Sequence, residues 1–314
     1  MGAAPTEIAI HRSDARRMGF FTDTTTCIGC KACEVACKQW NDLPGDELRQ
    51  GKGHSYDYTG ALSASTWRHV RFVETTLPPG GGHLPALPAT NGSGATPPPG
   101  AGDDVMPSLV DVAAGQAAWA SAEDGALDRW VFMSDVCKHC SNAGCLDACP
   151  TGALIRTEFE TVIVQTDICN GCGYCVPACP FGVIERREED GRVFKCTLCY
   201  DRLKDGMEPA CAHACPTKSI QFGELEELRE RADAKLEKLH EAGFDDARLY
   251  LRDEADGIGG AGAFFLLLDE PEVYGFPPDP VSTTRDLPRL WKAAAVAAGV
   301  VVTAVAAAVA GGRR

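Results

Sequence analysis

Apolar positions along this chain come mostly in short runs, which are typical of small strands joined by tight turns. Residues 154–156 and 161–164 predict one pair of strands. Residues 183–186 and 192–194 predict a second pair, joined by an Asp-Gly turn. A further strand is expected at 263–268, where every residue is apolar. Together with the helices below, these runs predict an α+β fold.

Two segments of the same region predict helices. Residues 33–40 follow closely spaced cysteines and predict a short helix. In residues 224–242, leucines recur at helical spacing among alternating charges. We expect this amphipathic helix to pack on the domain in a structural role.

The C-terminal segment has a different pattern. Residues 293–310 are eighteen residues without a charge, nearly all Ala and Val. At about 1.5 Å per residue, such a helix just spans a hydrocarbon core, so we predict a single membrane anchor at 290–312. Its small side chains favour close packing against other membrane helices. A buried helix of a soluble protein is the alternative.

Two segments are assigned no chemistry. Residues 76–129 are rich in Pro, Gly and Ala and predict an irregular surface insertion. Residues 257–262 match G-x-G-x-x-G literally, but the strand expected at 263–268 follows where a dinucleotide site requires a helix. We therefore reject a dinucleotide site.

The composition is acidic, with 44 Asp and Glu against 30 Lys and Arg and a formal net charge of −14. Such a surface argues against nucleic acid as a partner. It is compatible with docking onto redox proteins.

The sixteen cysteines form four groups of four, and none is left over. The groups are Cys27, Cys30, Cys33 and Cys37; Cys137, Cys140, Cys145 and Cys149; Cys169, Cys172, Cys175 and Cys179; and Cys196, Cys199, Cys211 and Cys215. The third group, followed by Pro180, has the C-x2-C-x2-C-x3-C-P spacing of bacterial ferredoxins. The spacing predicts four [4Fe-4S] clusters and an electron-transfer function.

The ligand sets follow from how two-cluster ferredoxins share cysteines, since the fourth cysteine of a group ligates the neighbouring cluster. The two middle groups are close in sequence and would exchange ligands in this way, and by elimination so would the outer two. The expected sets are Cys27, Cys30, Cys33 and Cys215 for cluster 1; Cys37, Cys196, Cys199 and Cys211 for cluster 2; Cys137, Cys140, Cys145 and Cys179 for cluster 3; and Cys149, Cys169, Cys172 and Cys175 for cluster 4.

This exchange predicts one ferredoxin-like dicluster unit nested inside another. The outer unit comprises residues 1–75 and 180–223, and the inner unit comprises residues 130–179. A helix and strand extension at 224–289 would lead from them to the membrane anchor.

Other uses of the cysteines fit the spacing less well. Zinc sites take four ligands as two pairs, which leaves the third closely spaced cysteine and the Cys-Pro ending unexplained. Disulfide frameworks belong to short secreted chains. A zinc-bound structural protein remains the alternative of a different class.

Polar residues between the ligands are assigned minor roles. Lys31, Lys138 and Lys195 each lie beside a ligand and could raise a cluster potential, but we expect solvated lysines. His139 and His213 are expected to bind no iron, because cysteines fill all cluster positions.

Several motifs together resemble the iron-sulfur (beta) subunit of membrane-bound formate dehydrogenases. They are CIGCKAC at 27–33, WND at 40–42, GCGYC at 171–175, KCTLC at 195–199, EPAC at 208–211 and CPT at 215–217. The resemblance covers nearly the whole chain except the insertion. It implies the same ligand sets, and it implies four full cubanes, because no cysteine is replaced by the Trp found in nitrate-reductase relatives.

The resemblance also implies partners. Formate would be oxidised in a molybdenum or tungsten pterin alpha subunit, and electrons would pass through this chain, which has no active site, to a membrane cytochrome b gamma subunit and quinone. The cluster domain would lie on the extracytoplasmic side of the cell membrane. Arg16 and Arg17 are followed by no apolar stretch, so we expect export with a partner that carries the signal. The equivalent subunit of a quinone-linked hydrogenase, sulfoxide reductase or sulfur-compound reductase is the nearest alternative.

Overall fold

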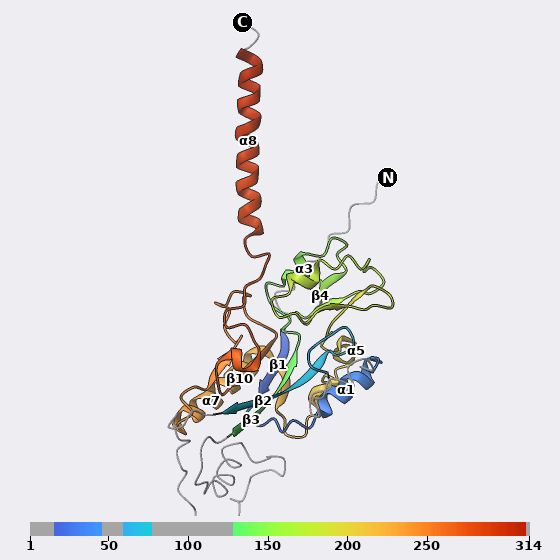
Figure 1. Cartoon of the computed structure of the whole chain (residues 1–314), viewed down its shortest axis with the longest axis vertical. Helices are drawn as coiled ribbons and strands as arrows, with labels where there is room; N and C mark the ends of the chain where they lie inside the picture. The colour runs from blue at the N-terminus through green and yellow to red at the C-terminus, as the bar shows by residue number, and fades with distance from the viewer. Residues whose placement is uncertain (1–15, 46–58, 77–127, 312–314) are drawn as a thin grey trace, which may run out of the picture.

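The computed structural model describes residues 16–45, 59–76 and 128–311. There the chain forms a body of short strands and helices, from which one long helix, α8 (Leu287–Gly311), projects (Figure 1). The predicted α+β character is confirmed. The insertion predicted at 76–129 lies almost entirely outside the described residues.

A four-stranded mixed sheet lies at the centre of the body, in the order β8-β1-β10-β9. Its strands are β1 (Met18–Asp23), β8 (Ile220–Glu224), β9 (Arg248–Tyr250) and β10 (Ala263–Leu267). Strand β1 runs parallel to β10 and antiparallel to β8. All of β10 is buried, as expected for an apolar run in a central strand covered on both faces. The sheet thus joins the start of the described chain to residues about 240 positions later.

Helix α7 (Leu225–Glu241) is the amphipathic helix expected at 224–242. It packs on β1 through a buried face that includes Leu225, Leu228 and Leu239. Its structural role as a cover for the sheet is confirmed.

A long hairpin that the sequence analysis did not predict brackets the insertion. Strand β2 (Arg68–Thr76) pairs antiparallel with β3 (Asp128–Val136) along its whole length, from Arg68 opposite Val136 to Thr76 opposite Asp128. The rings of Phe72 and Phe132 pack edge to face across it, with centroids 5.0 Å apart. The residues on either side of the insertion are therefore neighbours in a sheet.

Both predicted strand pairs are present. Strands β4 (Leu154–Arg156) and β5 (Val162–Val164) form one hairpin, and β6 (Glu185–Arg186) and β7 (Val193–Phe194) form the other. A small second core beneath them includes Leu154, Val162, Cys175, Ile184 and Val193. This core combines residues of the predicted inner unit with residues that follow it in sequence.

The remaining α-helices are short, and each contains or adjoins a cysteine. They are α1 (Ala32–Trp40), α3 (Gly144–Asp147), α4 (Cys175–Ala178), α5 (Tyr200–Lys204) and α6 (Ala210–His213). The 3-10 helix η3 (Pro271–Tyr274) follows β10. Helices α1 and α6 pack together, although about 170 residues separate them.

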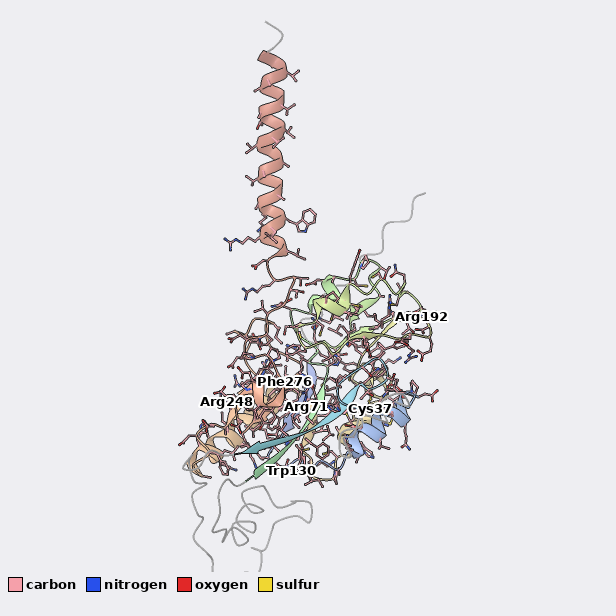
Figure 2. The ribbon with its side chains drawn as sticks, in the orientation of Figure 1. Cys37, Arg71, Trp130, Arg192, Arg248 and Phe276 are labelled. Atoms are coloured by element: carbon pink, nitrogen blue, oxygen red, sulfur yellow. The ribbon has the colours of Figure 1, made fainter. Side chains whose placement is uncertain are left out.

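Helix α8 stands apart from the body. Its stretch Arg289–Ala310 is long and apolar enough to cross a membrane, and none of it is buried within the described chain. Its side chains project with no other element beside them (Figure 2). Within the described chain, α8 is therefore not a buried core helix, and its exposure fits association with a membrane. At 1.5 Å per residue, α8 is about 37 Å long, enough for the hydrocarbon core.

Candidate iron-sulfur cluster sites

All four cysteine groups begin with the same loop geometry. In each group the residue before the second cysteine has a left-handed backbone, which turns successive N–H groups toward one side, as in an anion-binding nest. These residues are Gly29 (φ 66°), His139 (φ 46°), Gly171 (φ 72°) and Leu198 (φ 58°). In the last loop the Leu198 N–H donates to Cys196 Sγ at 3.3 Å. In this loop a backbone N–H group is therefore directed at a cysteine sulfur.

Three of the groups also end alike. Cys149, Cys179 and Cys215 each precede a proline, and the residue three positions after each cysteine has a left-handed backbone and donates its N–H to the cysteine carbonyl. The hydrogen bonds run from Gly152 to Cys149, from Gly182 to Cys179 and from Lys218 to Cys215, each at 3.3 Å. The first group differs, because its fourth cysteine, Cys37, lies within helix α1.

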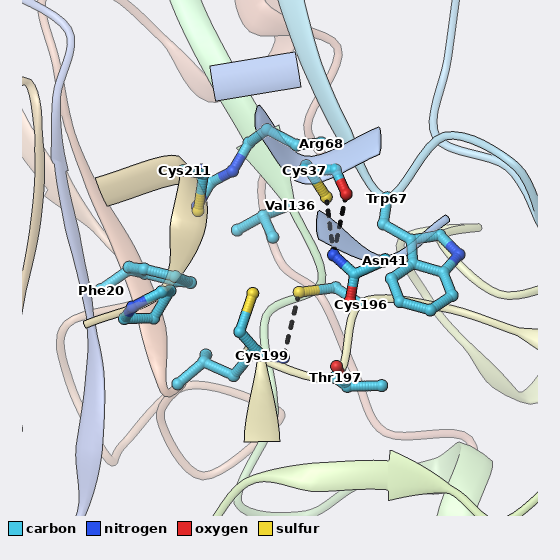
Figure 3. Close-up of a pocket in the computed structure, with 12 residues that line it drawn as sticks. Phe20, Cys37, Asn41, Trp67, Arg68, Val136, Cys196, Thr197, Cys199 and Cys211 are labelled. Carbon is cyan, nitrogen blue, oxygen red and sulfur yellow. Dashed lines mark hydrogen bonds between the residues drawn. The ribbon is translucent and has the colours of Figure 1, made fainter. Parts of the chain in front are cut away.

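The thiols predicted for cluster 2 line one cavity (Figure 3). Cys37 comes from α1, Cys196 and Cys199 from the loop before α5, and Cys211 from α6. The Asn41 amide donates to Cys37 O at 2.8 Å and lies 3.7 Å from Cys37 Sγ. Residues up to 174 positions apart in sequence thus face one space.

Burial opposes ionisation of Cys37, Cys196 and Cys199 without a metal core. Burial, with a smaller contribution from neighbouring thiols, raises the pKa of Cys196 to about 12 and of Cys199 to about 11. Burial and then Cys196, Cys211 and Cys199 hold the pKa of Cys37 well above its ordinary value. A cationic iron core removes that cost by coordination. The residues present fit an iron-sulfur cluster.

Thiols predicted for cluster 1 also raise the pKa values of other thiols in that set. Burial raises the pKa of Cys27 to about 11, and Cys215 and Cys30 contribute to the rise. Burial raises the pKa of Cys33 to about 12. Cys215, the expected exchanged ligand, therefore lies beside Cys27.

The set predicted for cluster 3 has the same character. Burial holds the pKa of Cys140 well above its ordinary value, and Cys137, Cys179 and Cys145 add to the effect in that order. Burial likewise raises the pKa of Cys145 to about 12. All four expected ligands are neighbours.

The set predicted for cluster 4 is the most solvent-accessible. Burial, together with Cys149, Cys172 and Cys169, raises the pKa of Cys175 to about 11. Burial alone would raise the pKa of Cys149, but the Thr151 hydroxyl and the backbone N–H groups of Leu154, Ala153 and Thr151 outweigh it and lower the pKa. These donors form a cradle for a thiolate.

Thiols of one set also affect thiols of another. Cys211 raises the pKa of Cys33, Cys137 raises the pKa of Cys196, and Cys175 raises the pKa of Cys145. Each pair joins one predicted set to the next.

The expectation that the lysines beside the ligands are solvated is wrong for two of them. Lys138 is buried in an ion pair with Asp135, and its ammonium lies 4.4 Å from the centre of the Phe276 ring. Lys195 is also buried and donates to the carbonyls of Val162 and Cys196. Lys31 is partly buried, 3.5 Å from the Glu34 carboxylate. Local sequence does not reveal this burial.

The two histidines, which we expected to bind no iron, contact other groups of the chain. His139 is buried, and its Nδ1 accepts the Val162 N–H at 3.1 Å. Burial and then Lys195 lower the pKa of His139 well below its ordinary value, so the ring is neutral. His213 is exposed and lies 2.9 Å from Glu208.

The segment at 257–262 supports a cysteine loop. Gly260 O and Ile258 O accept the N–H groups of Ser141 and Asn142 at 3.0 and 2.8 Å, just after Cys140. A Cβ at Gly257 would lie 2.4 Å from Pro280 O, so the glycine allows close packing. The segment leads into β10, as predicted, and opens no helix.

Two arginines to which the sequence analysis gave no role at the cluster sites contact residues of the cysteine loops. Arg17 donates to Ser141 Oγ at 2.7 Å and to His139 O at 3.2 Å, so it belongs to the folded body. Arg68, at the start of β2, is fully buried and donates to Cys211 Sγ at 3.2 Å. No periodicity or spacing near Arg68 marks it, because its importance depends on the pairing of β2 with β3.

The fold and its repeated cysteine loops define an electron-transfer protein of the ferredoxin-like dicluster class. In agreement, residues 26–153 and residues 128–225 each match a family model described as "4Fe-4S dicluster domain". These matches favour iron-sulfur clusters over the zinc alternative.

The relatives narrow the class. The chain is 35% identical over 309 residues to the nitrate-inducible formate dehydrogenase iron-sulfur subunit of Escherichia coli (strain K12), covering 95% of this chain and 85% of that protein. It is 36% identical over 277 residues to the formate dehydrogenase iron-sulfur subunit of Haemophilus influenzae, covering 86% and 71%. The B subunit of the E. coli anaerobic dimethyl sulfoxide reductase is more distant, at 29% over 217 residues, covering 68% and 76%. The protein belongs to the family of formate dehydrogenase iron-sulfur subunits, which transfer electrons and are not catalytic.

Proposed function

We propose that this chain carries electrons from a molybdenum or tungsten pterin subunit that oxidises formate, through four [4Fe-4S] clusters, to a membrane cytochrome b and quinone. When bound, each cluster accepts and releases one electron at a time. The chain's own contribution is to hold the clusters close together and to set their potentials. The observation that supports the proposal is that, in each expected set, thiols raise the pKa of another member of the same set.

We infer the order of the clusters from three pairs of thiols in which a member of one set raises the pKa of a member of another. Cys33 with Cys211 links set 1 to set 2, and Cys145 with Cys175 links set 3 to set 4. Cys196 with Cys137 links the two halves. We infer a single path in the order 1, 2, 3, 4, with clusters 1 and 2 in the outer dicluster unit and clusters 3 and 4 in the inner one.

The solvent exposure of the cysteines agrees with a path that has clusters 1 and 4 at its ends. Only these two sets include an exposed cysteine, Cys30 in set 1 and Cys172 in set 4. Exposed apolar side chains lie near each in sequence: Ile28 and Val35 near Cys30, and Ile168 and Tyr174 near Cys172. We infer that the two redox partners dock at these two ends.

The end near cluster 4 lies toward the membrane. Thr283 Oγ1 donates to Ala178 O at 3.1 Å, and Thr284 Oγ1 donates to Asp147 at 2.7 Å, just before α8 begins. The segment leading into α8 is thus fastened to α3 and α4 (Figure 1). We infer that electrons leave cluster 4 for the cytochrome b and enter at cluster 1. By family resemblance, the cluster domain lies on the extracytoplasmic side.

The test is purification of the native complex from membranes. We expect about sixteen irons per chain, a broad absorption near 400 nm, and a co-purifying pterin subunit with molybdenum or tungsten. A colourless zinc protein would refute the cluster assignment. A nickel subunit, or a pterin subunit that reduces sulfoxides and does not oxidise formate, would refute the assignment to formate and leave the electron path intact.

A further inference from the structure

Arg68 is a buried cation at the junction of two predicted cluster sites. Its guanidinium donates through Nη2 to Cys211 Sγ at 3.2 Å and through Nη1 to Ser134 O at 3.2 Å. It also lies over the Phe20 ring, 4.7 Å from the centroid. Cys211 belongs to set 2, while Ser134 Oγ lies 3.3 Å from Cys33 Sγ of set 1. Arg68 and Ser134 therefore connect the two sets.

The charge of Arg68 has no carboxylate partner among the described residues. Burial of an unpaired guanidinium is strongly unfavourable. The group that Arg68 contacts and that becomes anionic when it holds a cluster is Cys211.

The other buried cations are placed differently. Lys138 is neutralised by Asp135, so its field at the thiols of set 3 is partly cancelled. Lys195 is directed at two carbonyl oxygens. Among the described arginines and lysines, Arg68 alone donates a hydrogen bond to a cysteine sulfur. Its effect on a cluster should accordingly be the strongest.

We propose that Arg68 raises the reduction potential of cluster 2 and so favours electron transfer from cluster 1. The proposal rests on the proposed function, specifically on Cys211 as a ligand of cluster 2. With four thiolates, a [4Fe-4S] cluster has a net charge of about −2 when oxidised and −3 after one electron arrives, with no bond broken and no proton moved. A fixed positive charge and an N–H···S bond stabilise the more negative state.

The first test uses the wild-type complex. The reduced complex, with ¹⁵N-labelled arginine, is examined by pulsed electron paramagnetic resonance for hyperfine coupling to nitrogen. We expect ¹⁵N coupling on one cluster and its loss in Arg68→Lys, which keeps the charge but changes the donor atom. If cubanes are present and no arginine coupling is found, this proposal fails while the proposed function stands. If the complex has no cubanes, the proposed function itself fails.

The second test is a redox titration of the complex carrying Arg68→Met. At the wild-type midpoint, the ratio of oxidised to reduced cluster 2 should rise at least tenfold, which is about 59 mV for one electron. Arg68→Lys should give a smaller change. The matched control, Arg248→Met, removes a surface cation paired with Glu270 and should change no ratio more than about twofold.

Unchanged potentials in a fully loaded Arg68→Met complex would overturn the proposal. If that variant does not retain four clusters, the arginine coupling in the wild type decides the matter alone.

Discussion

The loop around cluster 4 offers a matched pair of glycines that separates backbone strain from steric fit. Gly171 and Gly173 have left-handed backbones with φ of 72° and 76°. A Cβ at Gly171 would lie 2.4 Å from Gly191 O in the β6-β7 turn, whereas a Cβ at Gly173 would meet nothing within 4 Å. The two Ala substitutions therefore share the strain and differ in the collision.

The expected magnitudes follow from these two contributions. A left-handed alanine costs about 1–2 kcal/mol, and the lower entropy of the unfolded chain offsets about 0.4–1 kcal/mol. Gly173→Ala should thus destabilise the loop by about 1 kcal/mol. Gly171→Ala adds overlap with a backbone carbonyl that moves only with its hairpin, which we place at about 1–3 kcal/mol by analogy with overpacked cores.

The assay is the rate at which the purified complex loses its absorption near 400 nm in denaturant with an iron chelator. If the collision is felt fully in the native loop and is relieved as the loop opens, Gly171→Ala should lose the first cluster roughly 5- to 150-fold faster than Gly173→Ala. Equal rates for the two variants would refute the reasoning. They would mean that the contact between the loop and the β6-β7 turn does not hold the site together.

Two further outcomes are expected. Cys215→Ser should remove the cluster held by Cys27, Cys30 and Cys33 and leave the one held by Cys196, Cys199 and Cys211. Iron content and the spectra of the reduced complex would follow this loss. If the second of these clusters were lost instead, the outer groups would not exchange ligands. Removal of residues 287–314 should release the cluster-loaded chain from membranes on ultracentrifugation, because α8 is the described segment able to span a membrane. If the shortened chain stayed in the membrane fraction, partner subunits would be holding it at the membrane.

The sequence was most informative where chemistry fixes the spacing of residues. The steps between cysteines predict the loops and their neighbours in space, because a cubane needs ligands at its corners. The two small hairpins and α8 could also be predicted from the sequence, since each depends on residues close together in the chain.

The pairing of strands that are far apart in the chain could not be predicted in this way. Strand β1 is six residues long, and its partners lie about 200 and 240 residues away, so no local period indicates the sheet. The same limit explains Lys138 and Lys195, which were expected to be solvated. Their burial depends on β5, β10 and η3, which pack over the cysteine loops only in the folded chain.

The hairpin of β2 and β3 has a practical consequence for work on this protein. Because Thr76 and Asp128 are opposite each other in the ladder, the 51 residues between them leave and rejoin the scaffold at one point. That point is at the far end of the body from α8 (Figure 1). Insertions are best tolerated where the flanking backbone is already held together. An affinity tag or a fluorescent domain placed there would report on the assembled complex from the side away from the lipid.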